Sequence, residues 1–365
     1  YSIMRVTEIG GTKESAPTPP FTVKSLRGCL YFMSTIPFKS FEDQIKKIRD
    51  KNILIDKKDE SRIIEILKNH SYYSLVNGYK PHFLLPGESD LMEDGTTFDH
   101  FFVSRMLDID MSNLIFKYIL LIEQSLRTRI AYVIAREFGT DDQKYLDDNN
   151  FVSDRVKAKT LKSIKTVRDF PMKGTHSDYF KNIKTVSIPP WILLLDIKYF
   201  DVINLYKVLP NNLREEIRKD YLGGINMYRK ENIEFINSMQ FLREYRNIAA
   251  HGKRNFEEKI DYSLDYEFAR LFYDNTIISV SDFNSKKKKK DLYACILLIF
   301  AYLNDPIIVN KFLSELLFLF TSQEYVDENF KGRILFNNKT IFDIYGLPPD
   351  FFNRLSHLIQ KKINT

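Results

Sequence analysis

The segment from Thr97 to Phe138 constrains the fold of this chain most, because about forty residues pass without a glycine or a proline. Apolar side chains recur at helical spacing through its centre, Leu114 to Ile134, and Gly139 follows as a stop signal. The whole chain has only 13 glycines and 13 prolines among 365 residues, and long elements with short connections favour helices. We therefore predict an all-α fold. About forty residues is long for one helix, so a break is expected near Asp108–Ser112.

Shorter periodic patterns predict further helices on both sides of this segment. Ser40 followed by Asp43 resembles a helix cap, and a second helix is predicted over Glu60–Asn69. Trp191 to Leu209 predicts one apolar helix that ends at Pro210. More apolar helices, and a short strand near 333–336, are expected toward the C-terminus. These patterns divide the chain into an extension (1–32), a small helical N-terminal lobe (33–95) and a helical domain with C-terminal helices (96–365).

Composition limits the compartment and the partners. Cys29 and Cys295 are far apart and have no metal-binding spacing, which excludes a disulfide scaffold or zinc site and fits a reducing cytosol. The chain has no apolar run of eighteen residues, and Tyr1 to Leu30 lacks the apolar core of a signal peptide, so no membrane partner is expected. The formal net charge of +6 is compatible with a polyanionic partner.

The segment with the clearest chemistry lies at the end of a helix predicted to begin near Asn232. Its apolar face spans roughly 140° at about 100° per residue and consists of Phe235, Phe241, Leu242, Tyr245 and Ile248. Arg246 lies just past one edge of this face, and Asn247 and His251 follow on the polar side, with the small Ala250 leaving space between them. Gly252 is suited to end the helix directly after His251.

Arg246, Asn247 and His251 are therefore candidates for RNA cleavage. RNA carries its own nucleophile, the 2′-hydroxyl beside the scissile phosphate. A guanidinium can hold phosphate oxygens, and an imidazole can gain and lose a proton near neutral pH. The other histidines show no metal-binding spacing, so neither a metal nor another cofactor is expected. An arginine five residues before a histidine is common by chance. The intervening asparagine, the Ala-His-Gly end and the following Arg-Asn pair make this motif more specific.

These residues, with others in the same order, resemble abortive-infection proteins of the AbiD/AbiF type, which carry a HEPN domain. The resemblance covers about Met33 to Asn255. It rests on Pro37-Phe38-Lys39-Ser40, Gln44-Ile45, Asp56, Tyr72 to Tyr79, Ile122 to Ala131, Phe138-Gly139, Pro189-Pro190-Trp191, Arg246-Asn247, Ala250-His251 and Arg254-Asn255. The chain departs from the family pattern at Tyr199-Phe200-Asp201-Val202, where a turn with Phe-Gly is expected; this affects helix packing and no motif residue.

The resemblance implies a helical bundle that cleaves RNA without metal in bacterial phage defence. Its arginine and histidine motifs usually face each other in pairs, and some members are held by a small noncoding RNA. One good motif per chain then implies a two-fold homodimer with both His251 side chains in one basic cleft. The residues expected to contact RNA there are Arg243, Lys253, Arg254, Asn255, Arg127 and Arg129.

Glu123 and Arg127 interrupt an otherwise apolar helix and are four residues apart. We expect this pair to be buried and to orient the motif helix, with Arg127 or Arg129 near the site. The alternative is an ordinary surface pair that contributes only about 0.3–0.5 kcal/mol.

Two other functions compete with a ribonuclease. The first is a non-catalytic HEPN module that binds RNA or a partner protein, which typically follows loss of the arginine or the histidine; both are present here. The second is a small-molecule enzyme with a catalytic histidine, for which neither a second acid–base group nor a cofactor motif can be named.

Overall fold

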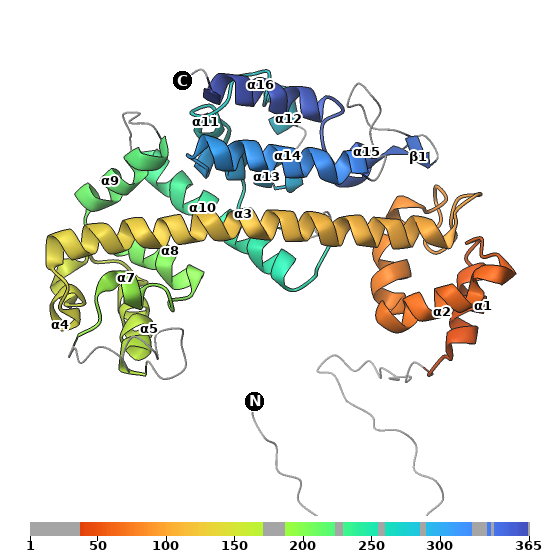
Figure 1. Cartoon of the computed structure of the whole chain (residues 1–365), viewed down its shortest axis with the longest axis horizontal. Coiled ribbons are helices and arrows are strands. Elements are labelled where there is room, and N and C mark those ends of the chain that lie inside the picture. Colours follow the sequence, from red (N-terminus) through yellow and green to blue (C-terminus); the bar gives the residue numbers. More distant parts are fainter. Residues whose placement is uncertain are drawn as a thin grey trace, which may run out of the picture.

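The computed structural model describes residues 37–170, 187–222, 229–254, 260–284, 290–322, 334–336 and 339–363, and their fold is all-α, as predicted. The central element is α3 (Phe98–Phe138), which has 41 residues and is therefore about 60 Å long. The remaining helices pack along α3, with one group over each end and a third along one side (Figure 1). The predicted extension at 1–32 lies outside the described residues.

Helix α3 has no break, so the interruption predicted near Asp108–Ser112 is wrong. Asp108 and Ser112 are both buried, and Asp108 accepts a hydrogen bond of 3.0 Å from the Tyr79 hydroxyl. Packing of other elements on α3 thus gives a polar residue in the middle of the helix a hydrogen-bond partner. This packing stabilises a helix longer than local propensity alone would support. The helix ends where predicted, at Gly139, whose φ of 84° lies in the left-handed region.

The N-terminal helices have a hydrophobic cluster of their own, which includes Phe101 at the start of α3. They are α1 (Phe41–Arg49), η1 (Lys57–Asp59), α2 (Glu60–Asn69), the π-helical turn η2 (Tyr73–Asn77) and η3 (Lys80–His82). The predicted cap is confirmed, because the Ser40 side chain accepts a hydrogen bond from the Asp43 backbone N–H. The predicted bounds of α2 are also confirmed.

The opposite end of α3 is covered by α4 (Asp142–Tyr145), η4 (Asp148–Asn150), α5 (Lys157–Asp169), α7 (Pro190–Leu193), α8 (Tyr199–Val208) and α9 (Asn211–Leu222). The single helix predicted over Trp191–Leu209 is wrong, since α7 and α8 are separate. The turn between them leaves carbonyl groups outside any helix, and Arg127 of α3 donates hydrogen bonds to the carbonyls of Leu194 and Ile197. A buried guanidinium thus satisfies backbone groups that the break exposes.

The third group packs on α3 and on α10 (Arg229–Ala250). It consists of α11 (Tyr266–Ala269), α12 (Val280–Asn284), α13 (Leu292–Tyr302), α14 (Pro306–Ser322), β1 (Ile334–Phe336), β2 (Lys339–Thr340), α15 (Ile341–Tyr345) and α16 (Phe351–Ile363). Helix α13 is buried along its whole length, as its apolar sequence predicts. The predicted strand near 333–336 is β1, which pairs antiparallel with β2.

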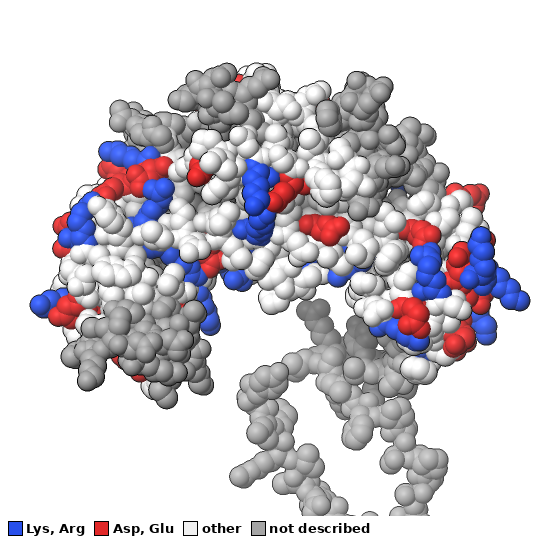
Figure 2. Space-filling view, viewed as in Figure 1, with Lys and Arg blue, Asp and Glu red and all other residues white. Residues whose placement is uncertain are grey.

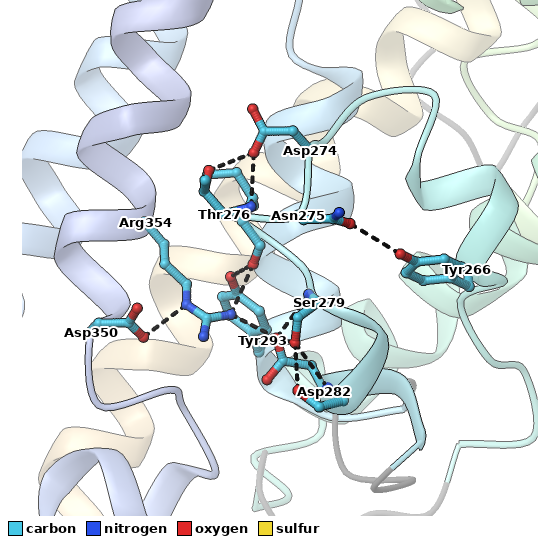
Figure 3. Close-up of polar contacts among 11 residues, drawn as sticks. Tyr266, Asp274, Asn275, Thr276, Ser279, Asp282, Tyr293, Asp350 and Arg354 are labelled. Atoms are coloured by element: carbon cyan, nitrogen blue, oxygen red, sulfur yellow. Dashed lines mark hydrogen bonds and ion pairs between the residues drawn. The ribbon is translucent and has the colours of Figure 1, made fainter.

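Arg354 attaches α16 to the rest of this group (Figure 3). Its guanidinium donates to Asp350, which directly precedes α16, and to Asp282 of α12, each at 2.8 Å. It also donates to the Ile277 carbonyl at 3.1 Å. These carboxylates satisfy the arginine, so the cluster in Figure 3 ties helices together. Within the residues that the structure describes, no helix is both long and apolar enough to cross a membrane.

Candidate functional site

The motif residues lie at the carboxyl-terminal end of α10, which crosses α3 obliquely and packs on it more extensively than any other helix does (Figure 1). All five residues of the predicted apolar face are buried. Gly252 ends the helix with a φ of 61°, and the Lys253 N–H donates to the Ile248 carbonyl at 3.1 Å, which closes a left-handed cap. The cap leaves His251 exposed on the last turn.

A pocket of about 250 Å³ opens beside His251. It is lined by Arg243, Glu244, Asn247, Ile248, His251, Lys253, Ile260 and Asp261. The structure thus brings together four of the predicted residues, of which Arg243 and Lys253 are cationic. Burial raises the pKa of Glu244, and the Arg243 guanidinium at 3.8 Å opposes this shift. The volume lies slightly below the roughly 300–1,000 Å³ that is typical of small-molecule sites.

Arg243 is held in place by two neighbours that sequence reasoning missed. Its Nε donates to the Gln240 side chain at 2.7 Å, and its guanidinium lies over the Phe200 ring at 5.3 Å from the ring centre. Gln240 is buried and belongs to α10, whereas Phe200 belongs to α8. Phe200 is one of the positions where the chain departs from the family pattern. The aromatic ring there holds the planar guanidinium through a cation–π contact.

Arg246 does not line this pocket and lies on the side of α10 that faces α3. Its Nε is 3.5 Å from the buried Glu123 carboxylate, and its guanidinium lies 5.4 Å from the centre of the Phe116 ring. Its Nη1 donates a hydrogen bond of 3.5 Å to the side-chain oxygen of Asn247, which itself lines the pocket. The side chain is 32% exposed, although its Nε atom is buried.

Glu123 joins two arginines. One carboxylate oxygen accepts a hydrogen bond from Arg127 and the other faces Arg246. The side chains of Glu123 and Arg127 are only 6% and 11% exposed, so the predicted burial of this pair is confirmed and the surface alternative is excluded. Arg127 also donates through Nη1 to backbone carbonyls between α7 and α8. Glu123 therefore couples α3 to the motif helix.

Arg129 and Arg127, both predicted to contact RNA, do not line the pocket of His251. Arg129 forms an ion pair with Asp220 and lies over the Tyr221 ring, 4.7 Å from its centre. Its guanidinium is engaged with α9, away from the end of α10. Arg127 is engaged within the core, as described above.

The loop after α10 is anchored to the N-terminal helices. Arg105 of α3 donates to the Gly252 carbonyl at 3.2 Å, and it lies 3.9 Å from Asp108, the partner of Tyr79. Arg254 packs on Gly78, where a β-carbon would come within 2.6 Å of its guanidinium. Arg105 was not anticipated, because no motif marks a residue so distant in the sequence. The predicted contact residue Asn255 lies outside the described residues.

Charge on the face in Figure 2 is mixed: Lys and Arg side chains alternate with Asp and Glu and form no continuous basic surface. Within the described ranges, no group of three or more His, Cys, Asp or Glu side chains is arranged to hold a metal ion. The pocket of His251 is also mixed in charge, because Glu244 and Asp261 line it beside Arg243 and Lys253.

Comparison with known proteins gives one match. A family model described as Abi-like protein covers residues 65–257, which is more than half of the chain and includes α3, α10 and the motif. Neither the curated proteins nor the solved structures contain a match.

Proposed function

Because the chain belongs to the Abi-like protein family, we propose that it acts in abortive infection during phage defence, as a HEPN-type endoribonuclease of the AbiD/AbiF group that needs no metal. The observation that carries this proposal is the pocket in which an exposed histidine, an asparagine and two cations converge at one helix end, beside Glu244 and Asp261. The proposed substrate is RNA, and the exposed His251 side chain is accessible from solvent.

The proposed reaction is a transesterification within the RNA. One His251 imidazole removes the proton of the 2′-hydroxyl, whose oxygen attacks the adjacent phosphorus. The bond to the 5′-oxygen breaks, and a protonated imidazole gives that oxygen its proton. The products are a 2′,3′-cyclic phosphate and a 5′-hydroxyl. The reaction involves no oxidation or reduction.

The cations have separate tasks in this scheme. Arg243 and Lys253 line the pocket and would neutralise the phosphate charge as it develops. Arg246 would reach the phosphate past Asn247, with its Nε 3.5 Å from the Glu123 carboxylate in an ion pair without a hydrogen bond. A planar guanidinium can make bidentate contact with phosphate oxygens through its remaining nitrogens.

The test of this function is cleavage in the presence of a chelator. Purified protein incubated with labelled bacterial RNA and excess EDTA is expected to give fragments with 2′,3′-cyclic phosphate ends. Loss of cleavage on adding EDTA would contradict metal independence. RNA that is bound but remains intact would favour the non-catalytic HEPN module instead.

We further expect a homodimer. The pocket of about 250 Å³ contains one histidine, whereas the reaction needs one group to take a proton and another to give one. A two-fold axis beside the end of α10 would bring a second His251 to the same phosphate. Light scattering is expected to give about twice the chain mass of 43.2 kDa.

A monomer with full specific activity would contradict this arrangement. A mixed dimer of one native chain and one His251→Ala chain goes further, because it measures how much activity a single histidine supports.

A further inference from the structure

A second and larger pocket, of about 530 Å³, lies at the other end of α10. Its polar lining comes from the loop after η4, from α8, from α9 and from the start of α10: Ser153, Asp154, Lys207, Asn211, Arg214, Glu215, Arg218 and Asn232. Asn232 and His251 are nineteen residues apart, or about 28 Å along the helix. This pocket is therefore separate from the motif.

The charges in this pocket do not balance. Asp154 is paired with Lys207 at 3.6 Å, and Glu215 is paired with Lys219 at 3.2 Å. Arg214 and Arg218 form no ion pair with any carboxylate in the described part of the chain. Two arginines four residues apart on one helix face repel each other, and an anion that contacts both would relieve this repulsion.

Both guanidinium groups are fixed on one edge and unsatisfied on another. Arg218 is only 4% exposed, and its Nη1 donates to Asn232 at 2.6 Å and to the Tyr206 hydroxyl at 3.2 Å. Arg214 donates through Nη1 to the Lys207 carbonyl at 3.3 Å. The Nε atom of each is buried without a hydrogen-bond partner, which is costly for a charged donor. Burial also lowers the pKa of Arg214; Tyr206 and the Asp154 carboxylate oppose this shift, and the neighbouring Arg218 charge adds to it.

The geometry points to a binding site for a small phosphorylated molecule, whose phosphate joins Arg214 and Arg218. Fixed guanidinium edges suit the oxygens of a phosphate. Val152, Ile233 and Ile236 supply an apolar wall for the organic part of the ligand. The volume falls within the roughly 300–1,000 Å³ of small-molecule sites. Nothing in this assignment depends on RNA cleavage.

Calorimetry with the full chain tests the site, with inorganic phosphate, ribose 5-phosphate, AMP and adenosine as probes. We expect saturable binding of ribose 5-phosphate or AMP, weaker binding of inorganic phosphate, and none of adenosine. Absence of binding by all three phosphorylated probes would overturn the assignment. Equal affinity for inorganic phosphate and the larger probes would overturn the role of the apolar wall.

Three variants locate the ligand. Arg214→Gln is expected to weaken binding by about tenfold or more, because it removes a charged hydrogen bond. Glu215→Gln is expected to tighten binding, because it removes a negative charge from the lining. Arg136→Gln is the matched control: it removes the same charge from an exposed ion pair outside the pocket and should leave affinity unchanged. Unchanged affinity in Arg214→Gln would place the anion elsewhere. RNA cleavage is not a readout here, so this test and that of the ribonuclease fail independently.

Discussion

Replacing His251 with alanine is expected to abolish RNA cleavage while the protein remains folded. General acid–base catalysis contributes about 10²–10⁴-fold to rate, and a scheme in which His251 moves both protons loses this contribution. The side chain is exposed on the last turn of α10, so the change in unfolding free energy should stay within about 0.5 kcal/mol. Cleavage rates with labelled RNA, together with a urea unfolding curve, measure both effects. Any growth arrest caused by expression should also disappear.

His357→Ala is the matched control for this substitution. His357 is 51% exposed on α16 and lies 3.6 Å from Asp274, outside the motif pocket. The His357→Ala substitution removes another exposed imidazole without changing α10, so cleavage should continue at the native rate. Undiminished cleavage by His251→Ala would refute the assignment of that residue.

Glu123→Gln is expected to destabilise the fold and to impair cleavage together. The substitution removes the negative charge that Arg127 and Arg246 share, and leaves a buried guanidinium without its counterion. Loss of one partner of a buried ion pair costs about 3–5 kcal/mol. Arg246 would also lose its ion-pair partner, so its contact with phosphate would become less well ordered. The unfolding free energy and the cleavage rate measure the two effects.

Glu216→Gln provides the comparison. Glu216 accepts two hydrogen bonds from Arg136, at 2.6 and 2.7 Å, in a pair whose side chains are 38% and 44% exposed. Exposed pairs contribute about 0–1 kcal/mol, so this variant should be close to native in stability and activity. If Glu123→Gln were as stable as Glu216→Gln, the coupling of α3 to α10 through that carboxylate would be disproved.

The helices were predictable where local signals decide them. Apolar spacing and stop residues gave the bounds of α2 and the ends of α3, and the glycine after His251 marked the cap of α10. Two errors have the same cause, which is a contact with a residue distant in the sequence. Tyr79 stabilises α3 through the expected break, and Arg127 satisfies the carbonyls between α7 and α8.

The sequence was enough to predict which residues belong to the candidate site, but only part of how they are arranged. Helical periodicity placed Asn247 and His251 on the polar side of α10, but it could not indicate that Arg246 faces Glu123 of another helix. The charged residues within the apolar centre of α3 were the readable signal for that contact. A similar signal, two arginines four residues apart on α9, was present in the sequence and was not interpreted.

Helix α13 shows that the region matched by the family model does not form a separate folding unit. The match ends at residue 257, yet α13 and α14 follow it and cover α3 and α10. Tyr302 bonds the Ser238 side chain, and the Phe312 ring lies 4.4 Å from that of Tyr118. A chain cut after the motif would expose this apolar surface to water. In evolution, a relative that ends near the motif must therefore cover the same side of both helices with another segment or with a second polypeptide.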